Sequence, residues 1–164
     1  MLDELLAANR EYANTFTLRG IPARAAKGFG LVTCIDTRID PLTALGLHPG
    51  DAKILRNAGG RCTPDVLRTL VLATNLLGVT HVAVMHHTDC ALANRSDPDV
   101  ASALAEAGAG DLAGWEFLSM QDPDAALASD VEAIRSCTAL RVGLHVEGWR
   151  YDVDTGLVHR IVTP

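Results

Sequence analysis

The hydrophobic positions of the chain follow two patterns, helical spacing and short continuous runs. In residues 1–16, apolar side chains recur at helical spacing, for example at Leu2, Leu5 and Leu6, which predicts a helix that packs on the body of the protein or on a partner. Further along, apolar runs bounded by glycine or turn residues predict buried strands. These runs are FGLVTC (29–34), AKILRNAGG (52–60), THVAVMHH (80–87) and LRVGLHVEGWRYDV (140–153).

Helix-start signals separate these runs. Thr63, for example, is a good capping residue and precedes Pro64, which suits the first helical position. The same combination of a capping aspartate and a proline occurs at residues 40–41 and 122–123. Helices are therefore predicted in DPLTALGL (40–47), in TPDVLRTLVLATNLLG (63–78), within the alanine-rich residues 91–120, and in DPDAALASDVEAIRSC (122–137).

Strands and helices alternate without a long linker or a repeat, which predicts one α/β domain over residues 1–164. Its central β-sheet should be mainly parallel and flanked by helices, with right-handed crossovers. The last strand continues through the turn DVDTGLV (152–158) into a hairpin, which adds an antiparallel strand at the C-terminus. In such a sheet, ligands bind beyond the carboxyl ends of the strands, where the strand order reverses.

Composition limits the classes of function. The net charge of -6, the pI near 5.4 and the absence of any basic run argue against a nucleic-acid surface. No apolar run reaches the roughly 18 to 20 residues of a membrane span, and the N-terminal residues do not resemble a secretory signal. We therefore expect a cytoplasmic protein whose four cysteines are not primarily disulfides. Cys137 is expected to be a small buried hydrophobe, and the role of Cys62 stays open.

Two of the predicted strands end in residues that can bind metal or transfer protons. The first strand leads into Cys34, Asp36 and Arg38, and the third leads into HHTDC, which carries His87 and Cys90. If the second strand lies on the far side of the first, the first and third strands are neighbours and their ends meet. Two thiolates and an imidazole are good ligands for Zn²⁺. The sequence therefore predicts a zinc site formed by Cys34, His87 and Cys90.

Three protein ligands leave the fourth zinc position to water, which is the arrangement of catalytic zinc sites. Asp36 and Arg38 are two residues apart and share a face if the chain stays extended. Arg38 can then hold the Asp36 carboxylate while this carboxylate accepts a hydrogen bond from the zinc-bound water. The alternative interpretation is a surface ion pair beside a buried cysteine.

The remaining histidines have no catalytic assignment. His86 adjoins His87, but successive side chains of a strand point to opposite faces, so we expect His86 to pack or to hydrogen-bond in support of the site. The histidines to which no role is given are His48, His81, His145 and His159.

These segments together resemble a known family. CIDTR and HHTDC are similar to the Cys-x-Asp-x-Arg and His-x-x-Cys signatures of the β-class carbonic anhydrases. ILRNAGG and LLGVTHVAVMHHTDC resemble the segments around that family's second and third strands, and EGWRYDVDTGLV resembles its terminal hairpin. The resemblance extends from Leu31 to Val158 and is greatest to the short bacterial members.

The resemblance implies a carbonate dehydratase, a zinc lyase that converts CO2 reversibly into bicarbonate and a proton through a zinc-bound hydroxide. It implies that Cys34, His87 and Cys90 hold the zinc and that Asp36 and Arg38 form a catalytic pair. It also implies that a closed state exists in some members, in which Asp36 leaves the arginine and becomes the fourth zinc ligand at low pH. A homodimer or a dimer of dimers is implied as well, with the N-terminal helix embracing the partner.

One departure from the family concerns the residue after the second zinc cysteine, which is usually glycine and is Ala91 here. If this position needs a positive φ, alanine costs about 1 kcal/mol or more. If it opens a helix under the substrate pocket, the extra methyl group narrows the pocket. In either case the metal site should survive, while turnover and substrate preference are affected.

Other functions fit the same segments to different degrees. Hydrolysis of carbonyl sulfide or carbon disulfide, which are linear molecules like CO2, would use the same zinc ligands. A non-catalytic zinc-binding or anion-binding homologue would keep the fold, although the intact Asp36 and Arg38 argue against it. A thiol phosphatase or an arsenate reductase needs an arginine six positions after the cysteine. The chain has Asp40 there, which repels phosphate, and we reject this function.

Overall fold

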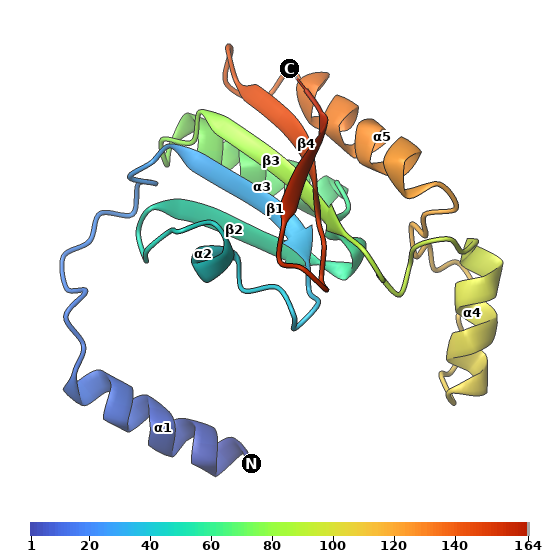
Figure 1. The fold of residues 1–164 in the computed structure, drawn as a ribbon, viewed down its shortest axis with the longest axis horizontal. Helices are drawn as coiled ribbons and strands as arrows, with labels where there is room; N and C mark the ends of the chain where they lie inside the picture. Colours follow the sequence, from blue (N-terminus) through green and yellow to red (C-terminus); the bar gives the residue numbers. More distant parts are fainter. Residues whose placement is uncertain (164) are drawn as a thin grey trace.

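The computed structural model describes residues 1–163 of the chain, and Pro164 lies outside the described residues. A five-stranded sheet with the order β2-β1-β3-β4-β5 forms its centre (Figure 1). Strands β1 to β4 are parallel, and β5 runs antiparallel to β4. The predicted α/β fold with a mainly parallel sheet and a C-terminal antiparallel strand is confirmed. The strands are β1 (Phe29–Cys34), β2 (Ala52–Asn57), β3 (His81–His87), β4 (His145–Tyr151) and β5 (Val158–Val162).

The strand order reverses at β1. This strand pairs with β2 on one side and with β3 on the other, so the chain that leaves β2 passes over β1 to reach β3. Thr33 of β1 lies opposite Met85 of β3, which brings the carboxyl ends of the two strands to the same edge of the sheet. Parallel α/β sheets bind ligands at such a point. The predicted meeting of the first and third strands is therefore present.

Helices connect and flank the strands. The side chains of Asp40 and Thr63 accept backbone hydrogen bonds at the starts of α2 and α3, as predicted. Ser96 and Asp122 cap α4 and α5 in the same way, and each of these four helices has proline in its first turn. The helices are α1 (Leu2–Asn14), α2 (Pro41–Ala44), α3 (Pro64–Asn75), α4 (Asp97–Glu106) and α5 (Pro123–Arg135), together with the 3₁₀ turn η1 (Ala58–Gly60).

Two hydrophobic clusters form the core. In the first, Leu70 of α3 and Val131 of α5 pack against Val32 and Val84 of the sheet. The second cluster contains Leu31 and Met85, and it also contains two of the predicted zinc ligands, Cys34 and Cys90. The apolar strands thus supply both the core and the buried surroundings of the candidate site.

The last strand before the hairpin is shorter than the sequence predicts. β4 begins at His145 instead of at Leu140, because the residues before it form a turn in which Gly143 takes a φ of 77°. Helix α5 ends at Arg135, so Cys137 lies just past the helix instead of on it. Its thiol is partly buried and packs against the first cluster, in agreement with the expected hydrophobic role.

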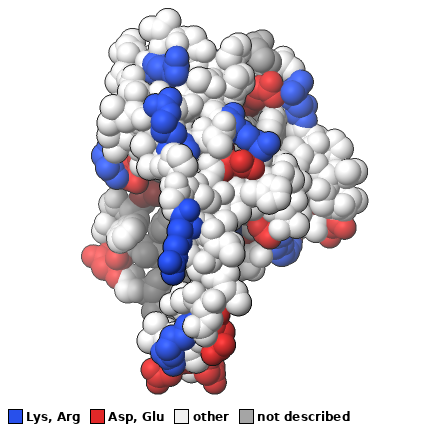
Figure 2. Space-filling model, turned by 90° about the vertical axis from the view of Figure 1, so that its left-hand side faces the viewer, with Lys and Arg blue, Asp and Glu red and all other residues white. Residues whose placement is uncertain are grey.

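Helix α1 stands apart from the sheet. None of its residues is buried, and Leu2, Leu5 and Leu6 are 70%, 62% and 58% exposed. In Figure 2 the helix projects from one end of the molecule, and acidic and basic side chains both lie near its tip. The predicted helix is therefore present, but it does not pack on the body of its own chain. Among residues 1–163, no helix is long and apolar enough to cross a membrane.

Candidate metal centre

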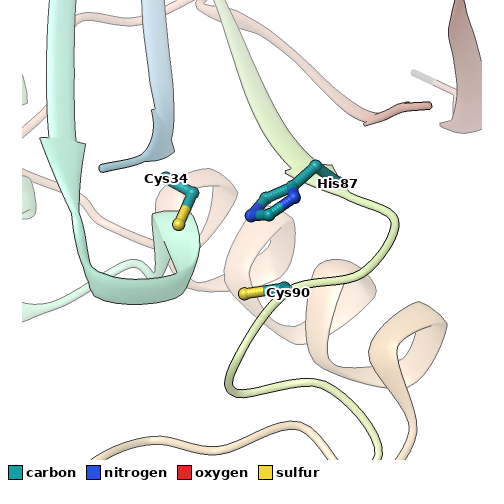
Figure 3. Close-up of side chains that lie close together, drawn as sticks. All are labelled: Cys34, His87 and Cys90. Carbon is teal, nitrogen blue, oxygen red and sulfur yellow. The ribbon is translucent and has the colours of Figure 1, made fainter. Parts of the chain in front are cut away.

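The carboxyl ends of β1 and β3 bring three potential metal ligands together. Cys34 is the last residue of β1, His87 is the last residue of β3, and Cys90 lies in the turn after β3 (Figure 3). One ligand atom of each residue, a sulfur or a ring nitrogen, lies within 4.8 Å of the other two. All three side chains are buried. The structure thus brings together the three residues that the sequence predicts as zinc ligands.

Two backbone features shape this cluster. Asp89 has a φ of 55°, and this left-handed residue turns the chain between His87 and Cys90. Gly60 of η1 packs tightly on the end of β1, since a Cβ atom at this position would lie 3.0 Å from the backbone nitrogen of Cys34. Because Gly60 also has a φ of 68°, a larger residue would be both crowded and strained there.

The orientation of His87 fits a metal ligand. Its Nδ1 lies 2.8 Å from the carbonyl oxygen of Thr88, which can only accept, so Nδ1 carries the hydrogen. Its Nε2 is buried and has no hydrogen-bond partner among the described residues. Metal-binding histidines commonly donate one ring N–H to a carbonyl oxygen and use the other nitrogen for the metal. The unpartnered Nε2 and the two nearby sulfur atoms are the donor set that zinc prefers.

The thiol of Cys34 lies in surroundings that favour its ionised form. The adjacent Cys90 thiol lowers the pKa of Cys34, and the nearby His87 ring and the backbone at Asp36 and Gly59 lower it further, against the opposing effect of burial. The thiolate is the form of cysteine that binds metal.

Asp36 and Arg38 form a close ion pair beside the three ligands. Arg38 donates from Nε and Nη2 to the two carboxylate oxygens of Asp36, at 3.0 and 2.8 Å. This bonding holds the pKa of Asp36 well below its usual range, so the carboxylate is ionised at neutral pH. Oδ2 of Asp36 lies 3.9 Å from Nε2 of His87. The pair that the sequence predicts is therefore present and adjoins the cluster.

The reason for this pairing differs from the one that the sequence suggests. The chain does not stay extended after Cys34 but turns, and the backbone N–H of Ile39 donates to the carbonyl oxygen of Asp36 at 3.1 Å. The backbone N–H of Arg38 also donates to Oδ1 of Asp36, at 2.9 Å. An aspartate that accepts a hydrogen bond two residues on is a common turn-forming element. The turn, and not a shared strand face, brings Asp36 and Arg38 together.

Sequence reasoning missed two residues that hold this turn. Asp89 accepts from Arg38 with Oδ2 at 2.8 Å and with its carbonyl oxygen at 3.1 Å. Arg56 of β2 donates to the carbonyl oxygens of Cys34, Asp36 and Ile39, at 2.8, 2.5 and 3.1 Å. The sequence signals were an aspartate between His87 and Cys90 and an arginine inside an otherwise apolar strand. Their partners lie 17 to 51 positions away in the chain.

His86 points away from the cluster and lies 3.1 Å from the carboxylate of Asp130, so the expected hydrogen-bonding role of His86 is confirmed.

Ala91 is exposed in a turn and is not one of the non-glycine residues with positive φ. It does not open a helix either, because α4 begins at Asp97. Neither of the two backbone conditions considered for Ala91 therefore holds.

Cys62 does not belong to the cluster of potential metal ligands. Burial raises the pKa of Cys62 to about 12, and the negative charge of Asp130 adds to this effect. The thiol stays protonated at neutral pH and packs against the first hydrophobic cluster. Cys62 is therefore a packing residue, which answers the question that the sequence left open.

Known proteins are similar to this chain in sequence and in fold. The sequence pattern of the family described as carbonic anhydrase matches residues 29–109. The chain is 32% identical to β-carbonic anhydrase 1 of Mycobacterium tuberculosis, over 99% of this chain and 98% of that protein. It is 28% identical to a carbon disulfide hydrolase of an Acidianus species, over 100% of this chain and 91% of that protein.

Comparison of the fold with solved structures points to the same family. The crystal structure of the carbonic anhydrase from Streptococcus mutans superposes on this chain with a TM-score of 0.89 and 34% sequence identity, and covers 98% of this chain and 96% of the other. Because the matches with the Mycobacterium tuberculosis and Streptococcus mutans proteins extend over nearly the whole of both chains, the similarity is not confined to one motif. The chain therefore belongs to the β-carbonic anhydrase family, a family of lyases.

Proposed function

We propose that this protein is a zinc-dependent carbonic anhydrase that interconverts CO2 with bicarbonate and a proton. The observation that carries the proposal is the cluster of Cys34, His87 and Cys90, in which a buried Nε2 with no hydrogen-bond partner in residues 1–163 lies near two sulfur atoms. The adjoining ion pair of Asp36 and Arg38 supplies a fixed carboxylate. Membership of the β-carbonic anhydrase family supports the same assignment.

In this proposal, Cys34, His87 and Cys90 hold the zinc ion. Zinc bound there would lower the pKa of a water molecule enough to supply hydroxide near neutral pH. Two thiolates balance the charge of the metal and weaken this effect, so the surrounding residues have to assist. Hydrogen bonds from the backbone at Asp36 and Gly59 to the sulfur of Cys34 reduce the negative charge on that ligand and so assist.

Asp36 provides the polar group that orients the reacting water. Its carboxylate is ionised and can only accept, so an O–H group next to it must donate to it. The bonds from Arg38 fix both carboxylate oxygens, and Asp89 in turn holds the arginine. In this arrangement Asp36 is bound to Arg38 and is free to act as a hydrogen-bond acceptor. A closed state with Asp36 as the fourth ligand would require a rearrangement that breaks the hydrogen bonds between Arg38 and Asp36.

Hydrolysis of carbon disulfide or carbonyl sulfide is the second candidate. The similarity to the Acidianus carbon disulfide hydrolase, which extends over the full length of this chain, favours it specifically. Both substrates are linear like CO2, and the same three ligands and the same carboxylate would serve. Cytoplasmic location is part of both proposals, because four free cysteines, two of them thiolate ligands, need a reducing compartment.

We also propose that the protein is a homodimer or a dimer of dimers. The apolar residues of α1 are exposed, and none of them belongs to the hydrophobic clusters of the described residues. An amphipathic helix of 13 residues gains little stability from its own hydrogen bonds, so it needs a surface to pack on. A second copy of the chain would provide that surface.

The activity is tested on a single zinc-loaded sample whose metal content has been measured. We expect CO2 hydration well above the uncatalysed rate between about pH 6 and 9, and none from the Cys34→Ser variant under the same conditions. Release of hydrogen sulfide from carbon disulfide, without CO2 hydration, would favour the second candidate. A full complement of zinc with neither activity would show a non-catalytic homologue.

The metal ligands are tested by metal content. Cys34→Ser and His87→Ala should each lose most of the zinc, because each removes one of three ligands. Cys137→Ser is the matched control, since Cys137 is a partly buried thiol outside the cluster, and it should keep the wild-type amount. Elemental analysis of the dialysed proteins measures the outcome. Full zinc in either ligand variant would contradict the assignment.

The role of Asp36 is tested by separating zinc binding from turnover. Asp36→Ala should keep its zinc but lose CO2 hydration by on the order of 10²-fold, as is typical when a proton-transfer partner is removed. Asp65→Ala is a suitable control, because Asp65 also pairs with an arginine, Arg68 at 2.7 Å, on the exposed face of α3. Stopped-flow hydration kinetics compare the two variants. An Asp36→Ala enzyme with wild-type turnover would exclude this role.

The packing of α1 is tested by the molecular mass in solution. Replacement of Leu5 and Leu6 together by Glu should convert the dimer into a monomer, because it places charges on the apolar face of the helix. Ala7→Glu changes the opposite side of the same helix and should leave the mass unchanged. Sedimentation equilibrium or light scattering measures it. A monomeric wild-type protein, or a dimeric double variant, would contradict this model of assembly.

A further inference from the structure

A buried carboxylate lies behind the candidate metal centre and has no part in the proposed chemistry. Asp130 of α5 is 5% exposed and lies on the side of the sheet that α5 covers. Its Oδ2 accepts from Nε of Arg61 at 2.6 Å and lies 3.1 Å from Nε2 of His86. Its Oδ1 accepts from Nη2 of Arg61 at 3.4 Å and from the backbone N–H of Cys62 at 3.0 Å.

This network is charged although it is buried. Burial alone would raise the pKa of Asp130, but the bonds from His86, Arg61 and Cys62 hold it below its ordinary value. A buried ion pair is a weak source of stability, because the loss of hydration of both charges offsets much of their attraction. Apolar residues of similar volume often stabilise a core as well or better. Stability alone therefore gives a poor account of Asp130.

The hydrogen-bond partners of Asp130 lie next to two of the segments that carry the metal ligands. His86 is the residue before His87 on β3, so its side chain fixes the strand next to that ligand. Cys62 and Arg61 follow Gly60, whose backbone packs directly against Thr33 and Cys34. The carboxylate of Asp130 thus joins the end of β3 to the turn that supports the end of β1.

Arg61 extends the network to the third segment. It also donates to the carbonyl oxygen of Leu118, a residue with a left-handed φ of 54°. Two residues later, Met120 donates to the carbonyl oxygen of Leu92 at 2.8 Å, and its own carbonyl oxygen accepts from the backbone of Asn94 at 2.6 Å. These contacts fix the chain that follows Cys90.

We propose that Asp130 is a positioning residue for the metal centre, which sets the relative places of Cys34, His87 and Cys90 through His86 and Arg61. This inference rests on the proposed zinc site. It assigns to Asp130 no contact with the metal or the substrate. Its effect is on geometry, because three sulfur and nitrogen atoms bind zinc tightly only when they are held in a near-tetrahedral arrangement.

The test uses Asp130→Asn, which keeps the size of the side chain but removes its charge. We expect zinc to be held about 10- to 100-fold more weakly, which is the usual range when a supporting group of a metal site is lost. Chelator competition measures the zinc affinity, and the absorption spectrum of the cobalt-substituted protein reports the ligand geometry. The control is Asp124→Asn, because Asp124 lies on the same helix and forms an exposed ion pair with Arg150 at 2.7 Å.

Each outcome decides the proposal. Weaker zinc binding together with an altered cobalt spectrum in Asp130→Asn, and neither change in Asp124→Asn, would support it. A lower unfolding temperature with unchanged zinc affinity and spectrum would overturn it, because Asp130 would then only stabilise the fold. If Asp130→Asn does not fold, Arg61→Lys provides the same test with the charge retained, and unchanged zinc binding there would also overturn it.

The experiment separates this proposal from the proposed function. A wild-type protein that binds no zinc would end both proposals. A wild-type protein that binds zinc and hydrates CO2, with an Asp130→Asn variant that holds zinc equally well, would end only the positioning role.

Discussion

The parallel pairing of β1 with β3 is the interaction on which the rest of the structure depends. The register that sets Thr33 opposite Met85 fixes where both strands end, and it brings a cysteine and a histidine 53 positions apart in the chain to one edge of the sheet. A shift of this register by one residue would turn His87 to the other face and replace it with His86. The packing of both strands opposes such a shift, because it would also move Met85 and Leu31 out of one hydrophobic cluster and into the other.

The two arginines near the candidate centre, Arg38 and Arg56, bind different groups and leave the metal ligands free. Among the described residues, Arg56 donates to backbone carbonyl oxygens at the end of β1 and in the turn that follows, and Arg38 binds the carboxylates of Asp36 and Asp89. Neither arginine takes up Nε2 of His87, which is left without a protein partner among the described residues. Arg56 thus holds the shape of the turn, and Arg38 keeps Asp36 ionised. The nitrogen of His87 and the sulfur atoms of Cys34 and Cys90 remain available to a metal.

The sequence predicts the elements and the site to different extents, for physical reasons. Strands that end in Cys34 and His87 are recognisable because an apolar run stops at a polar residue, and the topology of a parallel sheet then brings their ends together. The pairing of Asp36 with Arg38 is predicted correctly, but for the wrong reason. The prediction assumed an extended chain, whereas the structure has a turn there. Asp130 escapes prediction because Arg61 lies 69 positions away and nothing local marks the helix position as charged and buried. The early start assigned to β4 fails because Gly143 turns the chain inside an otherwise apolar run.

Two of the three clustered donors are thiols whose sulfur atoms lie within 4.8 Å of each other, and this proximity has a consequence for the life of the protein in the cell. A thiolate next to a second thiol is the arrangement from which oxidants form a disulfide most readily. The chain without metal is then its most vulnerable form, since one oxidation event removes two ligands at once. Uptake of the ion would do more than complete a site, because it would also shield both sulfur atoms from peroxide during and after synthesis.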